Sequence, residues 1–485
     1  MSERETQTGR SRLSGAKLAL LEQRLARRKE AGAGGAGIGR RPVQESAPAS
    51  FSQEQVYRAT LAEGRPSLYN MVIEFAGLLN VAALERALGE ITLRHEILRT
   101  TFAEAADGGL LQMVAPPRPF RLALRDLSDL PEAERASRVR ELALAQGREL
   151  ASLGEYPPFR VTLFGLDETT HSLAVAIPHI ICDQWSLDVL TRELLTLYAA
   201  FGAGAPSPLA PLAVQYADYA HWQRQHLQGA TYDGLLDYWR RELAGCEFVL
   251  PLPTSRPRPP RQTFNGAYQT LVMPAELGAR LEELSRRENV TLYMTLLAAY
   301  QVLLHGLTGR EDVLVGSAVA GRDRVETEAL IGCFINLVVL RGRLGGDPTF
   351  RELVGRTSGA ALDAFAHQEM PFGRLAAELQ PAPDPRYTPL VQTNFTIHPA
   401  PPASAADAQP RGLAITSSML NLGRAAVDLT LSMTPSPRGL AATFEYNVDL
   451  FDESFITRLL EELQTLLTAV AADPERRLRT LAGEM

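Results

Sequence analysis

The stretch from Ile177 to Ser186, IPHIICDQWS, says more about fold and function than any other part of this 485-residue chain. It ends an apolar, strand-like run at Pro178, and His179 then stands four residues before Asp183. The unperturbed pKa of histidine lies near neutrality, so its imidazole accepts a proton without help from neighbouring groups. One interpretation is therefore a general base at the end of a buried strand, with a carboxylate close by.

Two other interpretations of this spacing stay open at this point. Taken alone, His179 fits a strand-end histidine capped by a local hydrogen bond better than it fits a catalytic base. A zinc site is disfavoured, because no third ligand follows at a useful spacing and the cysteines are scattered. The choice between these interpretations depends on the rest of the chain.

The composition, 45% hydrophobic and 22% charged, is typical of a soluble globular protein, and the length predicts two or three domains. The net charge of −7 suggests no basic face for nucleic acid. Cys182, Cys246 and Cys333 are far apart, which fits a reducing compartment without structural disulfides. The polar N-terminus lacks a secretory signal and no apolar run is long enough for a bilayer, so we expect a cytoplasmic protein without membrane contact.

Residues 1–47 differ from the rest and are predicted to form a flexible tail, either a linker or a docking segment. Ser14 is a suitable cap for a short helix in this tail, and the glycine-rich residues 31–39 follow it. These glycines include a formal Gly-x-Gly-x-x-Gly pattern. We reject a nucleotide-binding loop there, because no strand precedes it and Arg40-Arg41-Pro42 follows where a helix would begin.

Beyond residue 48, helix-like and strand-like segments alternate in two series of similar content, which indicates an α/β protein with two halves. The apolar spacing predicts helices at 81–93, 131–149, 187–201, 276–287, 292–306, 348–366 and 452–471. Strands are predicted at 160–166, 171–177, 313–319, 337–341, 391–397, 428–433 and 440–446.

Several separated segments resemble, in family order, the motifs of the condensation domains of nonribosomal peptide synthetases. Besides the His-x-x-x-Asp stretch, these segments are Ser52–Gln55, Arg94–Phe102, Tyr216–Arg224, Ile331–Asn336, His367–Phe372 and Arg386–Gln392. The chain is most similar to the LCL-like branch of these His-x-x-x-Asp acyltransferases. The resemblance implies two chloramphenicol-acetyltransferase-like lobes in a V-shaped pseudo-dimer around a central substrate tunnel. We expect the N-terminal lobe at 48–224, carrying the His-x-x-x-Asp loop, and the C-terminal lobe at 225–485.

The resemblance also implies a function. Such an enzyme joins an acyl or aminoacyl thioester on a donor peptidyl carrier protein to an amine on an acceptor carrier. Both substrates are attached to the phosphopantetheine arms of the carrier proteins, so we expect the chain to bind no cofactor of its own. We also expect it to be a monomer. The chain lacks adenylation and carrier sequences, which fits a free-standing enzyme acting in trans or a piece of a larger synthetase.

The resemblance assigns roles to particular residues. His179 removes a proton from the amine or orients it, and Asp183 fixes the loop rather than contacting substrate. A buried aspartate needs a cation, because an unpaired buried charge is costly, and we expect Arg99, rather than Arg94, to supply it. Asn336 is expected to face the tunnel.

Two positions depart from the family pattern His-His-x-x-x-Asp-Gly. Pro178 replaces the first histidine, which is usually structural. Gln184 replaces the glycine, beside Trp185 and Ser186 on the expected acceptor side of the tunnel. Since glycine permits close backbone approach, glutamine there would narrow one side, select an unusual acceptor or spoil activity. Alternatives are therefore an acyltransferase that forms an ester with an alcohol, and a non-catalytic carrier-binding domain that recruits a tailoring enzyme.

Overall fold

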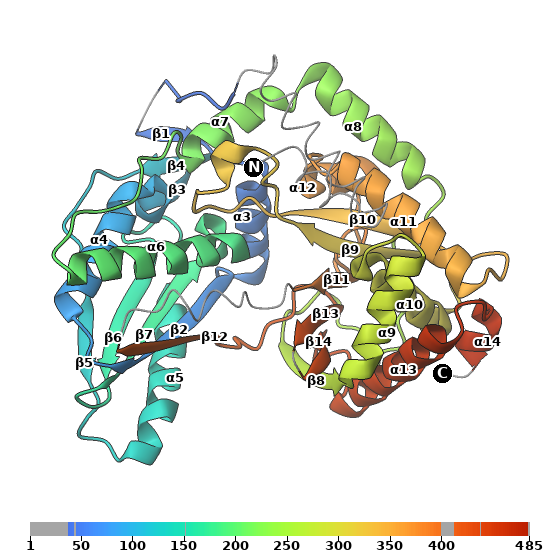
Figure 1. The fold of residues 1–485 in the computed structure, drawn as a ribbon. Helices are drawn as coiled ribbons and strands as arrows, with labels where there is room; N and C mark the ends of the chain where they lie inside the picture. Colours follow the sequence, from blue (N-terminus) through green and yellow to red (C-terminus); the bar gives the residue numbers. More distant parts are fainter. Residues whose placement is uncertain (1–36, 43–44, 151, 399–411, 437, 484–485) are drawn as a thin grey trace, which may run out of the picture.

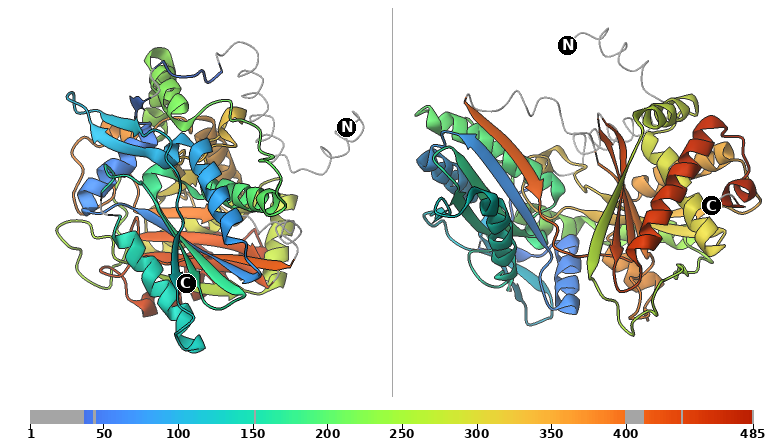
Figure 2. Two further views of the ribbon diagram at one scale, coloured as in Figure 1. Left: turned by 90° about the vertical axis from the view of Figure 1, so that its left-hand side faces the viewer. Right: turned by 90° about the horizontal axis from the view of Figure 1, so that it is seen from below.

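The computed structural model describes residues 37–42, 45–150, 152–398, 412–436 and 438–483. The chain forms two lobes that stand side by side (Figure 1). Seen from below, the lobes diverge as the arms of a V (Figure 2). The helix predicted to begin at Ser14 lies outside the described residues.

The N-terminal lobe is built on a mixed sheet with helices on both faces. Its strands, in spatial order, are β12 (Leu413–Met419), β2 (Leu68–Gly77), β7 (Thr170–Pro178), β6 (Arg160–Gly165) and β5 (Ala123–Asp126). Alternate residues of a strand point to opposite faces. Ile73 therefore joins the core under α4 (Val81–Arg94) and α6 (Gln184–Gly202). Val72 joins a smaller cluster under α5 (Glu132–Arg148).

The C-terminal lobe repeats this layered plan. Its strands, in spatial order, are β10 (Asn336–Arg343), β9 (Asp312–Val319), β11 (Thr393–Ile397), β13 (Leu429–Ser436), β14 (Gly439–Asn447) and β8 (Gly266–Met273). Its covering helices are α9 (Ala275–Arg287), α10 (Leu292–Thr308), α11 (Phe350–Ala366), α13 (Glu453–Ala472) and α14 (Leu478–Gly483). Every residue of α10 from Met294 to Leu304 is buried, which explains why this helix is apolar on all sides.

The described ranges contain no single helix that is both long and apolar enough to cross a bilayer. The pair α9 and α10 meets the length and composition of a span only when its two helices are taken together, and they are bent by 105° at the break between them.

The remaining elements belong to both lobes and to the junction between them. A small sheet contains β1 (Ser46–Pro48), β4 (Leu110–Val114) and β3 (Thr100–Glu104), and short 3-10 helices cover Glu96–Arg99, His179–Ile181 and Val325–Thr327. The helices are α3 (Phe51–Glu63), α7 (Tyr216–His226), α8 (Gly229–Glu242) and α12 (Phe372–Leu379). In Figure 1, α7 and α8 run across the top of the molecule from one lobe to the other.

The predicted helices and strands are confirmed, with ends that shift by a few residues. The predicted lobe boundaries need two corrections. The strand β12 lies beyond residue 224 in sequence, yet it pairs antiparallel with β2, from Leu413 opposite Gly77 to Met419 opposite Met71. The C-terminal half of the chain therefore completes the sheet of the N-terminal lobe (Figure 1).

The second correction concerns the predicted tail at 1–47. Ile38 and Arg41 are buried, and Arg41 Nη1 lies 2.8 Å from Asp218 Oδ1 while Nη2 lies 2.7 Å from Glu96 Oε2. Both carboxylates belong to the N-terminal lobe. The described residues 37–42 are thus part of that lobe rather than of a flexible linker.

Candidate functional site

His179 stands where β7 ends and a 3-10 turn begins. Its backbone N–H donates to Ser67 O at 2.8 Å, which continues the pairing of β2 with β7. Its Nδ1 lies 2.8 Å from Cys182 O. A carbonyl oxygen can only accept, so Nδ1 carries the proton and Nε2 carries the lone pair. Within the described part of the chain, Nε2 has no hydrogen-bond partner, so it is free to accept a proton.

The surroundings of His179 keep the imidazole neutral. Burial lowers its pKa below the ordinary 6.5, and the bond to the Cys182 carbonyl and the charge of Asp183 oppose this only in part. The ring of Tyr69 packs edge-on against the imidazole, with 5.0 Å between ring centroids. Cys333, from the C-terminal half of the chain, places its Sγ 3.9 Å from Nδ1. The histidine therefore lies at the junction of the two halves in its base form.

Asp183 is a buried structural carboxylate. It caps the N-terminus of α6, because Oδ1 accepts from the backbone N–H of Ser186 at 2.8 Å and from its hydroxyl at 2.6 Å. Oδ2 accepts from the backbone N–H of Phe334 at 3.0 Å. Because both oxygens are engaged and the residue is buried, this carboxylate holds the loop to the segment around Phe334.

The cation that neutralises Asp183 is Arg322, so the prediction of Arg99 was wrong. Arg322 Nη2 lies 3.0 Å from Asp183 Oδ1, and its Nη1 donates to Thr327 O and Leu330 O at 2.5 and 2.8 Å. Its guanidinium also stacks on the Phe334 ring at 4.0 Å.

Both arginines considered in the sequence have other partners. Arg99 bonds the carbonyl of Ala115 and lies 3.5 Å from Glu96, and Arg94 pairs with Glu193 at 3.0 Å. Arg322 was missed because it follows β9 in the other half of the chain. Its only sequence signal is a basic residue placed shortly before the Ile331–Asn336 motif.

The three residues after Asp183 have different environments. Gln184 is exposed at the first position of α6 and has no positive φ, so the backbone there does not require glycine. Its side chain bonds Asp188, which opposes the rise that burial causes in the pKa of that carboxyl. Trp185 is 37% exposed, and its Nε1–H donates to Glu328 O at 3.0 Å. Ser186 is buried, and its hydroxyl contacts Gly332 O at 2.8 Å.

Both polar atoms of the Asn336 amide hydrogen-bond a loop of the C-terminal lobe. Its Nδ2 donates to Gln368 O at 2.8 Å and to Met370 O at 2.7 Å, and its Oδ1 accepts from Phe372 N at 3.0 Å. The residue also lines a pocket at the lobe junction. Its position fits a wall of the cleft, but its polar atoms are occupied by the protein.

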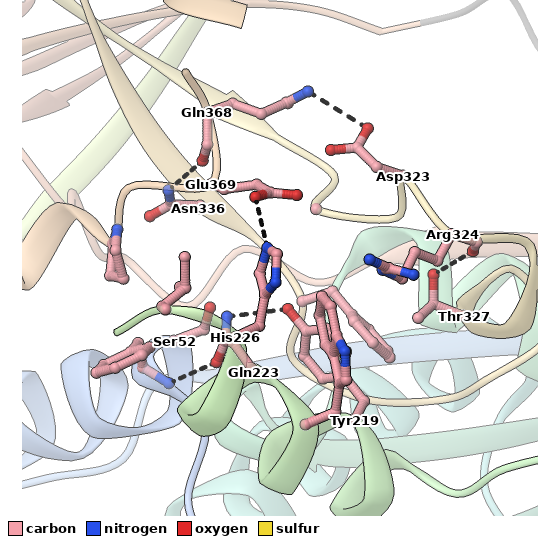
Figure 3. A pocket seen from close by; sticks show the side chains of 16 residues that line it. Ser52, Tyr219, Gln223, His226, Asp323, Arg324, Thr327, Asn336, Gln368 and Glu369 are labelled. Carbon is pink, nitrogen blue, oxygen red and sulfur yellow. Dashed lines mark hydrogen bonds and ion pairs between the residues drawn. The ribbon is translucent and has the colours of Figure 1, made fainter. Parts of the chain in front are cut away.

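That pocket is shown in Figure 3. Its walls come from the start of α3, from α7, from residues 321–327 and from the loop 368–371. His226 and Glu369 face each other across it, with 3.2 Å between Nε2 and Oε2 (Figure 3). Arg324 stacks on the Trp222 ring at 4.2 Å. Neither His179 nor the 184–186 segment is among its lining residues.

A second hollow adjoins the first and reaches Trp185. Trp185 lies there with Tyr293 and Phe365, beside the C-terminal ends of β9 and β11. Both hollows share Gly321, Asp323 and Gln368, so they meet at the segment that carries Arg322. In the described ranges, no group of three or more histidine, cysteine, aspartate or glutamate side chains is arranged to hold a metal ion.

Comparison with known protein families gives a match over most of the chain. The family model described as "Condensation domain" matches residues 43–482. A linear gramicidin synthase from Brevibacillus parabrevis is 41% identical over 439 residues, which cover 89% of this chain and 6% of that protein. Phosphinothricin tripeptide synthetase PhsB of Streptomyces viridochromogenes is 38% identical over 87% of this chain and 36% of its own length. The chain thus spans a small part of these relatives.

Solved structures give the same result for the fold. The X-domain from teicoplanin biosynthesis superposes with a TM-score of 0.82 at 29% identity, over 91% of this chain and 99% of that chain. The first condensation domain of the calcium-dependent antibiotic synthetase, in complex with a substrate analogue, gives a TM-score of 0.73 at 21% identity, over 89% and 98%. The predicted fold of two chloramphenicol-acetyltransferase-like lobes is confirmed.

Proposed function

Because the chain belongs to the condensation-domain family of nonribosomal peptide synthetases, we propose that it forms an amide bond between two carrier-bound substrates. The donor is an acyl or aminoacyl thioester, and the acceptor is the amine of an aminoacyl group. The observation that carries this proposal is the tautomer of His179. Its Nδ1–H is held by the Cys182 carbonyl, which leaves a neutral, unbonded Nε2 at the junction of the two lobes.

In the proposed reaction, the acceptor nitrogen attacks the thioester carbonyl carbon and a C–N bond forms. The carbonyl π electrons move to the oxygen, which becomes negatively charged. His179 Nε2 takes a proton from the attacking nitrogen. When the intermediate collapses, the electrons return to the carbonyl, the C–S bond breaks, and the thiolate receives the proton. The products are an amide on the acceptor arm and a free thiol on the donor arm.

The protein contributes position as well as a base. The loop that carries His179 is fixed from one side by the Ser67 carbonyl and from the other by the network of Asp183 and Arg322. Holding two tethered reactants in line with a fixed base replaces a bimolecular encounter with a unimolecular step. The partners proposed for this step are donor and acceptor peptidyl carrier proteins, and their phosphopantetheine arms carry the reacting groups.

The test replaces His179 with alanine. The variant should remain folded and lose turnover by about 100- to 10,000-fold, as is typical for removal of a general base. Product on an aminoacyl-loaded acceptor carrier is measured by intact-protein mass spectrometry, with a loaded donor carrier as co-substrate. His221→Ala is a matched control, because His221 lies on α7 with its Nε2 bonded to Gln225. Wild-type turnover in the His179→Ala variant would exclude a chemical role for the histidine.

A second candidate function is a binding domain that docks carriers and recruits another enzyme. One structural similarity favours this function. The X-domain of teicoplanin biosynthesis, which has been solved in a complex with OxyB, is 29% identical to this chain and superposes with a TM-score of 0.80. Carrier binding without any product would support this function.

A soluble alcohol offered in place of the acceptor amine tests the ester-forming alternative in the same assay.

A further inference from the structure

Most polar groups close to the His179 ring are already engaged. Nδ1 bonds the Cys182 carbonyl, and Asp183 receives donors on both oxygens. The hydroxyl of Ser67, which lies opposite His179 on the chain leading into β2, receives a hydrogen bond from Arg424 at 3.1 Å. The amide formation proposed above also needs a donor for the negative oxygen of the intermediate. The imidazole N–H is committed to Cys182 and a carboxylate has no proton to donate, which leaves hydroxyl groups beside the ring: Ser67, which accepts from Arg424 and keeps its own O–H, and Tyr69.

Tyr69 reaches the imidazole from the neighbouring strand. In the β2–β7 ladder Leu68 lies opposite Pro178 and Tyr69 opposite Ile177, and the His179 N–H continues the ladder to Ser67 O. Tyr69 is therefore the diagonal neighbour of His179 on the same face of the sheet, a position from which an aromatic side chain reaches its partner. The ring centroids are 5.0 Å apart, and the planes meet at 64°.

The hydroxyl of Tyr69 is unused, and its ring is partly buried against the core of the N-terminal lobe. It makes no hydrogen bond to any of the described residues, so its O–H remains available to donate to a substrate. Burial first, and the neighbouring Cys182, Asp183 and Cys333 next, raise its pKa well above 10. The group therefore stays protonated and can act only as a neutral hydroxyl.

A positive charge lies near both rings. Arg424 is held by Glu63, with 2.8 Å from its Nε to a carboxylate oxygen, and by the Ser67 hydroxyl. Its charge lowers the pKa of His179 and opposes the rise in the pKa of Tyr69, so it acts at both side chains. A negative oxygen formed beside these two rings would be stabilised by the same charge.

We propose that the Tyr69 hydroxyl donates a hydrogen bond to the thioester carbonyl oxygen as that oxygen becomes negative in the tetrahedral intermediate. This role rests on the amide-forming function proposed above. Tyr69 transfers no proton: its O–H bond stays intact while the carbonyl electrons move to the oxygen and return when the thiolate leaves. Base and oxyanion donor then come from adjacent strands of one sheet, on one face.

The test is Tyr69→Phe, which removes a single oxygen and keeps the ring. We expect kcat to fall about 100- to 1,000-fold, the effect typical of losing one oxyanion donor, with little change in KM. The melting temperature should not change, because the hydroxyl has no partner inside the described protein. The pH at which activity declines on the acid side should also stay in place, because the contact with the His179 ring is retained.

The control is Tyr57→Phe, which removes a hydroxyl that bonds Glu104 at 3.2 Å on the exposed side of α3 and should leave kcat unchanged. Three results would overturn the role of Tyr69: wild-type kcat in Tyr69→Phe, a loss confined to KM, or a loss accompanied by a lower melting temperature or a shifted pH profile. If Tyr69→Phe is fully active while His179→Ala is inactive, the oxyanion role fails and the proposed function stands. If the wild type itself forms no amide, both fail.

Discussion

At the scale of single residues, the Asp183 carboxylate joins the two halves of the chain, because it bonds residues from both. Its carboxylate receives donors from Ser186 on α6 and from Phe334 and Arg322 of the C-terminal half. Both Asp183 and Arg322 are 3% exposed, so each charge depends on the other for compensation. The network therefore fixes the His179 loop and joins the halves at the same time.

Asp183→Asn keeps the shape of the side chain but leaves Arg322 with an uncompensated buried charge. We expect the free energy of unfolding to fall by about 3–5 kcal/mol, measured by chemical denaturation. Asp188→Asn, which changes an exposed carboxyl on the same helix, serves as the control. Arg322→Met in the Asp183→Asn background should cost less than the sum of the single changes, because neither charge is then orphaned. Inactivation with unchanged stability would contradict this structural role.

The pH dependence of activity follows from the buried imidazole of His179. A general base works in its neutral form, and burial lowers the pKa of His179 below 6.5. Activity should therefore persist as the pH falls through 6.5 and decline only at a lower pH, where the folded protein binds the proton. The measurement is kcat/KM for carrier-bound substrates across this range. An acid-side midpoint at or above 6.5 would show that the imidazole is not desolvated as the structure implies.

At the scale of elements, the sequence predicted helices and strands that have a local apolar pattern, but it did not predict how distant segments pair. Helices such as α9 and α13 carry a strong apolar period of their own, so their positions followed from sequence alone. The strand β12 was not predicted, because most of its residues are exposed or half-exposed and its partner β2 lies far away in the chain. His179 and Asp183 were singled out by their spacing together with the family-like motifs elsewhere in the chain, whereas Arg322 and Tyr69 are brought to them only by tertiary contacts.

The N-terminus of α6 gives a prediction at this scale. Gln184 is exposed there, beside Trp185, whose ring lines the hollow near β9 and β11. Gln184→Gly should change the ratio of kcat/KM between bulky and small acceptors, while stability changes by about 1 kcal/mol or less. Gln184→Ala separates the causes, since it removes the side chain without adding backbone freedom. Unchanged acceptor ratios in both variants would exclude Gln184 from substrate selection.

At the scale of the whole molecule, the lobes are tied at more than one place. Besides the Asp183 network and β12, Arg424 from the segment after β12 reaches back to the end of α3. It pairs there with Glu63, whose side chain is only 3% exposed. A buried carboxylate in this position depends on its cation.

Arg424→Met should therefore destabilise the protein and loosen the contact between the lobes. We expect a fall of about 3–5 kcal/mol in the free energy of unfolding and a larger radius of gyration in small-angle X-ray scattering. Adding Glu63→Gln should recover most of this loss, since the orphaned charge is then removed. Equal stability of the Arg424→Met variant and the wild type would show that the ion pair contributes nothing to the junction.

The crossing of β12 has a consequence for anyone who recombines such domains. A chimaera that takes residues up to 224 from one parent and the remainder from another would inherit β2 and β12 from different parents. The seven paired positions from Leu413 to Met419 would then meet a foreign neighbour along the whole edge of the sheet. A design that transplants the N-terminal lobe together with residues 413–419 takes both β2 and β12 from a single parent. Such hybrids should express in folded form more often than hybrids made with a single splice.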